Sequence, residues 1–214
     1  RNTTGTVTLQ NKDIGDSYTN EIGTSDKGRR LKTNPLNMVN SSAVLQVRHQ
    51  DHGMYSTSNN VTISGASSGI STTLNGAITA ASTSLTLTSA TGFEASNLSS
   101  RCYVKIGNEI MFGTLSSTTI SSLSRGQASS TAAAHADDAT VELYQIFKTP
   151  LDQINKTHTA IANIGMDSYT VALTTAPTIS GNSTDSQVGG INVYASENFR
   201  YENIKTNISA LELP

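Results

Sequence analysis

Short segments in which apolar and polar residues alternate constrain this chain more than any other feature. They lie at residues 84–88, 101–106, 109–115, 118–123 and 140–146. Successive side chains of a β-strand point to opposite faces, so alternation with a period of two predicts half-buried strands. The Gly107-Asn108 pair between two of these segments favours a two-residue hairpin turn. Residues 60–148 therefore predict a small antiparallel β-sandwich or barrel module.

The composition favours strands and leaves little material for a core. Ser and Thr make up more than a quarter of the chain, whereas 36% of the residues are hydrophobic, 5% are aromatic and none is Trp. Thr is stiff at its branched carbon and Ser competes for backbone hydrogen bonds, so neither favours helix. The fold class that we expect is mainly β: a small antiparallel β-sandwich or barrel module with extended arms and one amphipathic helix.

That helix is predicted directly after the module. Thr149 suits the N-cap, Pro150 the first helical position and Asp152 the positive end of the helix dipole, while Gly165 can end the helix. Four apolar side chains and one histidine recur between Pro150 and Gly165 at spacings of three and four: Leu151, Ile154, His158, Ile161 and Ile164. We predict that these five side chains form a docking face, buried against the module or a neighbouring chain.

The chain divides into three parts on this interpretation. Residues 1–59 form an extended N-terminal arm and connector, residues 60–148 the β-module, and residues 149–214 the docking helix followed by an extended C-terminal arm. Apolar positions are too sparse before residue 50 and beyond residue 180 to offset the entropy of ordering those segments. We therefore expect the module to fold alone and the arms to become ordered against neighbouring proteins.

Charge and hydropathy argue against nucleic-acid and membrane partners. Lys and Arg number 14 against 16 Asp and Glu, which gives a formal net charge of −2. The basic tract Lys27–Lys32 is diluted by Gly28 and Leu31, and we interpret it as a solvated face or the rim of an interface. No apolar run approaches the length of a membrane span.

The densest polar cluster is Arg48–Met54. His49, Asp51 and His52 could supply three ligands to a metal, but no fourth ligand is near in sequence. We predict a strand-to-turn corner without metal, in which Gly53 takes a positive φ. Cys102 alternates with Val104 and Ile106, which indicates a small buried side chain rather than a nucleophile.

The sequence contains no motif that indicates catalysis. His135 and Asp137 could form an orienting pair, but no nucleophile motif such as G-x-S-x-G completes it. Glu109 and Glu142 are the strand carboxylates that a glycan hydrolase could use. We expect no enzyme activity, no catalytic residue and no cofactor.

Two sets of segments resemble known proteins. Residues 77–144 are similar to a small β-module that recurs in bacteriophage tail proteins, through Thr91-Gly92-Phe93, Ser124-Arg125-Gly126-Gln127 and Ala134-His135-Ala136. The flanking segments 34–38, 47–55 and 149–164 resemble virion structural proteins of contractile-tailed phages that infect cyanobacteria and other marine bacteria.

This resemblance implies a structural component of a phage tail or baseplate. Its partners would be other virion proteins in multiple copies, and it would be assembled in the host cytoplasm and located in the virion. The alternative is a carbohydrate-binding or adhesin module of a tail fibre that recognises a host-surface glycan. Tyrosines could stack on sugars in that case: Tyr55, Tyr103, Tyr144, Tyr169, Tyr194 and Tyr201.

Overall fold

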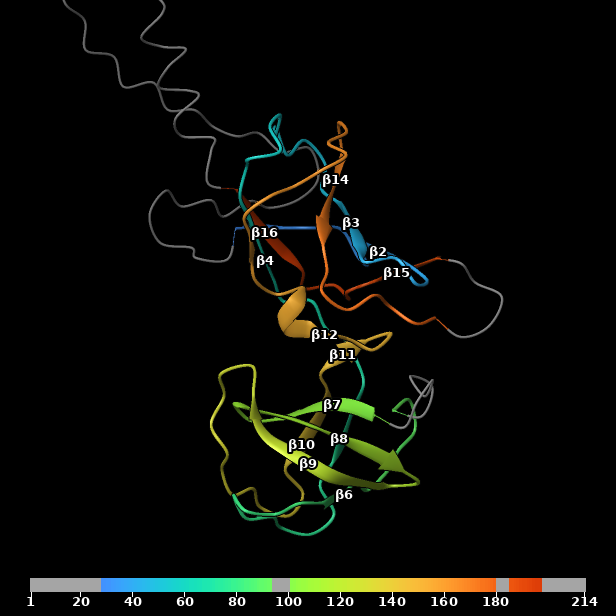
Figure 1. The fold of residues 1–214 in the computed structure, drawn as a ribbon, viewed down its shortest axis with the longest axis vertical. Coiled ribbons are helices and arrows are strands. Elements are labelled where there is room, and N and C mark those ends of the chain that lie inside the picture. The colour runs from blue at the N-terminus through green and yellow to red at the C-terminus, as the bar shows by residue number, and fades with distance from the viewer. Residues whose placement is uncertain (1–27, 94–100, 180–184, 198–214) are drawn as a thin grey trace, which may run out of the picture.

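The computed structural model describes residues 28–93, 101–179 and 185–197, which form two lobes stacked along the long axis of the molecule (Figure 1). The two-sheet lobe contains the described residues of 28–69 and 144–197, and the half-barrel lobe those of 70–143. The chain enters the half-barrel lobe after β4 (Val61–Ser64) and leaves it before β11 (Gln145–Ile146). Gly65 directly follows β4 with a φ of 75°, and a Cβ there would collide with the Asn192 carbonyl oxygen. Glycine is the residue that can adopt this positive φ and also lacks the Cβ that would collide.

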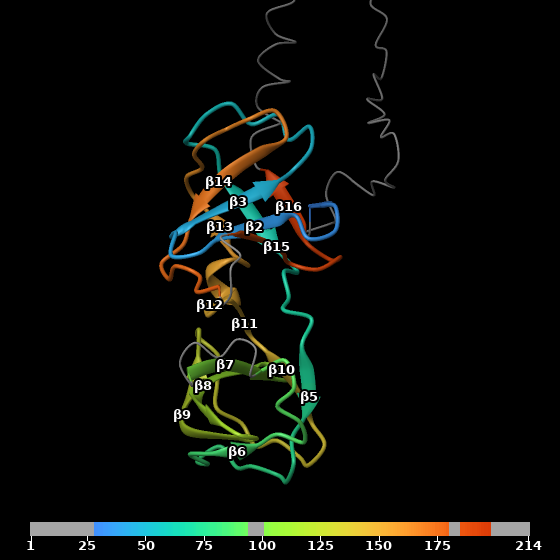
Figure 2. The same cartoon turned by 90° about the vertical axis from the view of Figure 1, so that its right-hand side faces the viewer.

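The half-barrel lobe is one curled antiparallel sheet (Figure 2). Its strands, in spatial order, are β5 (Ser71–Thr73), β10 (Thr140–Leu143), β7 (Arg101–Ile106), β8 (Glu109–Ser116), β9 (Thr119–Gln127) and β6 (Leu85–Thr86). Alternate residues of β7 and β10 point inward, as their sequence pattern predicts, and they pack with Met111 and Ile120 in one core. The prediction of a mainly β chain with antiparallel pairing is confirmed, with a half-barrel as its form.

Two further antiparallel sheets make the other lobe. One has the order β1 (Arg29–Arg30), β16 (Tyr194–Glu197), β4 and β13 (Thr157–His158). The other has the order β14 (Ser168–Ala172), β3 (Val44–Arg48), β2 (Leu36–Val39) and β15 (Asp185–Val188). A short hairpin of β11 and β12 (Thr149–Pro150) lies between these sheets and the half-barrel lobe (Figure 1).

This lobe differs from the predicted arms. Within the described ranges, the segments before residue 59 and after residue 149 pair with each other and share one hydrophobic core. Each segment alone has few apolar residues, but β3 and β14 align so that Leu45 and Val47 lie opposite Val171 and Tyr169. The predicted module boundary also moves, because β4 belongs to this lobe. Residues 1–27 and 198–214 of the predicted arms lie outside the described residues.

The predicted helix over Pro150–Ile164 is absent from the structure. After Pro150 the segment contains a 3₁₀ turn, η2 (Leu151–Gln153), then β13, which pairs with β4, and a single bridge from Ala162 to Thr170. Thr149 does not cap the turn, because its hydroxyl donates to the Thr175 carbonyl. Asn155 uses its side-chain amide on the backbone of Ala66, at 2.9 Å in both directions. These long-range bonds outweigh a weak local preference for helix.

Candidate functional site

A buried carboxylate ties together three segments of the half-barrel lobe. Glu109 is the first residue of β8, and its side chain is 1% exposed. Arg125 Nε and Nη2 donate to its two oxygens at 2.7 and 2.8 Å. His135 Nε2 lies 2.8 Å from Oε2, and the N–H groups of Ala133 and Gly126 donate to the carboxylate at 3.0 and 3.3 Å. The carboxylate thus has five polar contacts.

The hydrogen bonds keep this carboxylate ionised. Burial alone would raise the pKa of Glu109, but bonds from Arg125, the Ala133 N–H and His135 favour the charged form and bring its pKa down to about 2. Arg125 also donates to the Thr79 and Ala133 carbonyls, each at 2.7 Å. Five contacts saturate a carboxylate that has about four acceptor positions. The cluster therefore crosslinks the loops, and the acceptor positions of its carboxylate are used within the chain.

The other residues considered for catalysis lie apart from this cluster. Glu142 is exposed and lies 3.9 Å from Lys105, on the outer face of the sheet, whereas Glu109 lies on the inner face opposite Ile106. The two carboxylates therefore do not face a common substrate position. Asp137 accepts hydrogen bonds from the backbone N–H groups of Gly76 and Asp138. His135 contacts Glu109 rather than Asp137, its predicted partner. The sequence around His135 does not indicate this long-range contact.

Cys102 lies on the inner face of the half-barrel. Its side chain is buried in the core of that lobe, and burial raises the pKa of the thiol to about 12. The thiol is therefore protonated at neutral pH, a form that is a poor nucleophile.

The Arg48–Met54 segment forms a corner around buried rings. His49 and His52 are buried with ring centroids 5.8 Å apart, and Tyr169 packs against both at 5.9 and 5.3 Å. His52 Nδ1 accepts the Met54 N–H at 2.9 Å, and Gly53 has a φ of 68°. Asp51 is exposed, whereas the two imidazoles are buried. Among the residues described, no group of three His, Cys, Asp or Glu side chains is arranged to hold a metal.

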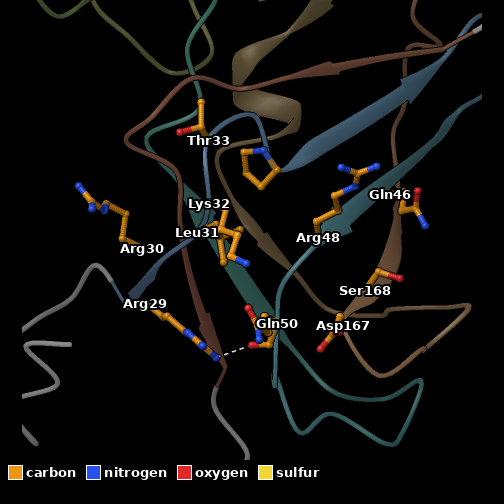
Figure 3. Close-up of a pocket in the computed structure, with 11 residues that line it drawn as sticks. Arg29, Arg30, Leu31, Lys32, Thr33, Gln46, Arg48, Gln50, Asp167 and Ser168 are labelled. Carbon is orange, nitrogen blue, oxygen red and sulfur yellow. Dashed lines mark hydrogen bonds between the residues drawn. The ribbon is translucent and has the colours of Figure 1, made fainter. Parts of the chain in front are cut away.

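The basic tract predicted to be a solvated face or an interface rim forms one side of a groove. The groove has a volume of about 620 Å³ and lies between the end of one sheet and β1 of the other. Residues 30–33 run along one side, and Gln46, Arg48, Asp167 and Ser168 along the other (Figure 3). Arg29 Nη1 donates to the Gln50 carbonyl and so closes one end.

The groove is strongly basic. Arg29, Arg30, Lys32 and Arg48 line it, and among the described lining residues Asp167 is the one acid. Oδ1 of Asp167 accepts the Asp51 N–H at 3.2 Å. Arg48 reaches the groove because β3 ends beside residue 35, where the Arg48 N–H donates to the Pro35 carbonyl. The basic tract is evident in the sequence, whereas Arg48 joins it only through this long-range pairing.

Four of the five predicted docking residues are buried in the two-sheet lobe, and Ile164 is half-buried. Leu151, Ile154 and Ile161 belong to its hydrophobic core, and Ile164 packs partly against it. His158 is 5% exposed and its Nε2 donates to the Ile154 carbonyl at 3.1 Å. The structure brings these residues together within one chain rather than on an outward-facing surface.

The tyrosines proposed for glycan stacking are spread over both lobes. Tyr169 is fully buried and Tyr55 is 68% exposed, while Tyr201 lies outside the described residues. Among the described residues, two aromatic side chains meet on the outer face of the half-barrel and form what we call the aromatic platform. There Tyr103 stacks on Phe112 with ring centroids 4.5 Å apart, and the Arg101 guanidinium lies 4.2 Å from the centre of the Phe112 ring.

The described residues thus define a mainly β protein with antiparallel sheets in two lobes, one internal charge cluster and one basic groove. No helix in the described ranges is long and apolar enough to span a membrane. Comparison of the chain with protein-family models, curated proteins and solved structures found no match.

Proposed function

We propose that this chain is a structural component of a phage tail or baseplate, located in the virion and assembled in the host cytoplasm. It holds neighbouring virion proteins together and carries out no catalysis. Its partners are other virion proteins in multiple copies, with neither nucleic acid nor a membrane among them.

One observation supports this proposal most directly: residues of the phage-like motifs hold a buried carboxylate that crosslinks the half-barrel lobe. Arg125 comes from the Ser124–Gln127 motif and His135 from the Ala134–Ala136 motif, and both bind Glu109. Two of the three motifs that carry the resemblance therefore meet at one carboxylate, whose acceptor capacity is used within the chain. This favours a module that serves as a rigid building block.

The edges of the sheets offer a means of assembly. Among the described strands, β1 and β13 end one sheet, β14 and β15 end another, and β5 and β6 end the half-barrel. A strand at a sheet edge presents backbone groups that a segment of another protein can pair with. These edges, on both lobes, suit a protein that contacts more than one neighbour.

Quantitative mass spectrometry of purified particles from a phage that encodes this sequence tests the proposal. The chain is expected at a fixed copy number relative to the tail proteins, with chemical crosslinks to at least one of them. Its absence from washed particles that contain the complete tail would contradict the proposal.

The aromatic platform supports a second candidate, a carbohydrate-binding module of a tail fibre. Phe112, Tyr103 and Arg101 gather two aromatic rings and a cation on one face of the sheet, and sugar rings pack against groups of this kind. Glycan-array binding that is lost in Phe112→Ala and retained in Tyr55→Ala would favour this alternative. An array without signal would leave the assembly role as the better account.

A further inference from the structure

The groove concentrates positive charge that the described part of the chain does not neutralise. Arg30, Lys32 and Arg48 are exposed and none of them is ion-paired within the described ranges. The carboxylate of Asp167 is the one negative group on the lining described, and it is also held by a backbone N–H. Like charges gathered on facing walls repel each other and attract an anionic partner. The charge of the groove therefore favours an anionic ligand.

The wall that carries Arg30 is also the edge of a sheet. β1 pairs with β16 on one side, with Arg29 opposite Ala195 and Arg30 opposite Tyr194, and it is the terminal strand of the described sheet. The Leu31 N–H donates to the Val193 carbonyl. Because bonded positions alternate along an antiparallel pair, the N–H and carbonyl of Arg30 are directed away from β16. This wall therefore offers backbone hydrogen bonds beside its cations.

From these two features we propose that the groove binds an extended, acidic segment of another protein. Carboxylates of the segment contact Arg30, Lys32 and Arg48, and its backbone adds to the outer edge of β1. A phosphate chain or a sulfated glycan could use the cations but has no amide backbone to pair with β1. The identification of the source as a neighbouring virion protein rests on the proposed function, whereas the binding chemistry does not.

Fluorescence anisotropy with the purified full-length chain tests the binding chemistry. The probe is a labelled peptide of alternating Glu and Thr, with peptides of alternating Gln and Thr and of alternating Lys and Thr as controls. The acidic peptide is expected to bind, and its affinity should fall as salt is raised. Equal binding of the Gln peptide would overturn the proposal.

Charge reversal locates the site. The double variant Arg30→Glu, Arg48→Glu should lose roughly tenfold or more in affinity, because two attractions become repulsions. Lys156→Glu is the matched control, since Lys156 is exposed in the same lobe and does not line the groove. Unchanged affinity in a double variant with a wild-type circular dichroism spectrum would overturn the proposal. The neutral variant Arg30→Gln, Arg48→Gln gives the same test without reversed charge and should show a smaller loss.

Backbone modification separates a peptide from other anions. Methylating alternate amides of the acidic peptide should abolish binding, because these amides then cannot donate to the Arg30 carbonyl. Undiminished binding of the methylated peptide would overturn strand addition. A sulfated oligosaccharide or an oligothymidylate that binds more tightly than the acidic peptide would overturn the choice of partner. Each of these results leaves the chain's copy number in particles untouched, so failure here is distinct from failure of the assembly role.

Discussion

Glu109 and Arg125 meet through two parallel hydrogen bonds of 2.7 and 2.8 Å, with side-chain exposures of 1% and 10%. One residue begins β8 and the other lies near the end of β9, so this pair connects a hairpin turn with a distant corner of the half-barrel. His135 adds a third segment to the same carboxylate.

Replacing Glu109 by Gln should destabilise the protein strongly. The substitution keeps the shape but removes the charge that compensates Arg125, and breaking a buried pair costs about 3–5 kcal/mol. Urea unfolding gives the change in free energy. Glu142→Gln, at an exposed pair on the outer face, is the control and should change stability by less than about 1 kcal/mol. Similar small effects for both variants would argue against the crosslinking role.

The same carboxylate predicts acid sensitivity. The pKa of Glu109 is lowered from 4.5 to about 2 in the folded protein, so the unfolded chain binds its proton first as pH falls. Its contribution is fully present above pH 4.5 and is lost between there and about 2. Unfolding free energies measured across this range should fall less steeply in Glu109→Gln than in wild type. Parallel pH profiles would contradict the pKa direction.

His158 should add a second loss of stability on acidification, in a pH range above that of Glu109. Burial lowers its pKa from 6.5, with Lys156 acting in the same direction, although its bond to the Ile154 carbonyl opposes them. Because the folded pKa lies below the unfolded one, stability falls as pH drops below 6.5. His158→Gln should flatten the unfolding free energy between about pH 7 and pH 5. The same slope in both proteins would show that His158 keeps its ordinary pKa.

The buried position of Ile154 distinguishes a core residue from a docking residue. Ile154 is 0% exposed, so Ile154→Ala should lower the stability of the isolated chain by about 2–5 kcal/mol. Met166→Ala, at a side chain that is 85% exposed, is the matched control and should have little effect. A loss of particle incorporation without a loss of stability would restore the docking interpretation.

Gly113 should tolerate no side chain, which the sequence alone does not indicate. A Cβ there would lie 2.5 Å from Ile120 Cγ2 and 2.8 Å from the Ser121 carbonyl oxygen on β9. Gly113→Ala should therefore cost about 1–3 kcal/mol through overpacking. At Gly165 the nearest atoms stand 3.5 Å away, and Gly165→Ala should be close to neutral in the same thermal-unfolding measurement. Equal melting temperatures for the two variants would contradict this.

Local patterns predicted the half-barrel strands well because each alternating face is buried within that lobe. The expected strand at 101–106 is β7, and the expected hairpin at Gly107-Asn108 joins β7 to β8. Alternation is a strong signal where one face of a sheet is covered and the other is exposed.

The helix prediction was wrong because the burial pattern on which it rested can also arise without a helix. Leu151, Ile154 and Ile161 are buried as a helical stripe would be, but they reach one core through a 3₁₀ turn and a short strand. Burial at spacings of three and four is therefore not unique to helices. The groove escaped prediction because it combines the basic tract with Arg48, and only tertiary pairing brings them together.

Cryo-electron microscopy of purified particles, from a phage that encodes this sequence, tests the assembly role most directly. We expect density for both lobes in the tail or baseplate, in multiple copies, with contacts to at least one other virion protein. A complete tail reconstruction in which every density is assigned to other proteins would contradict it.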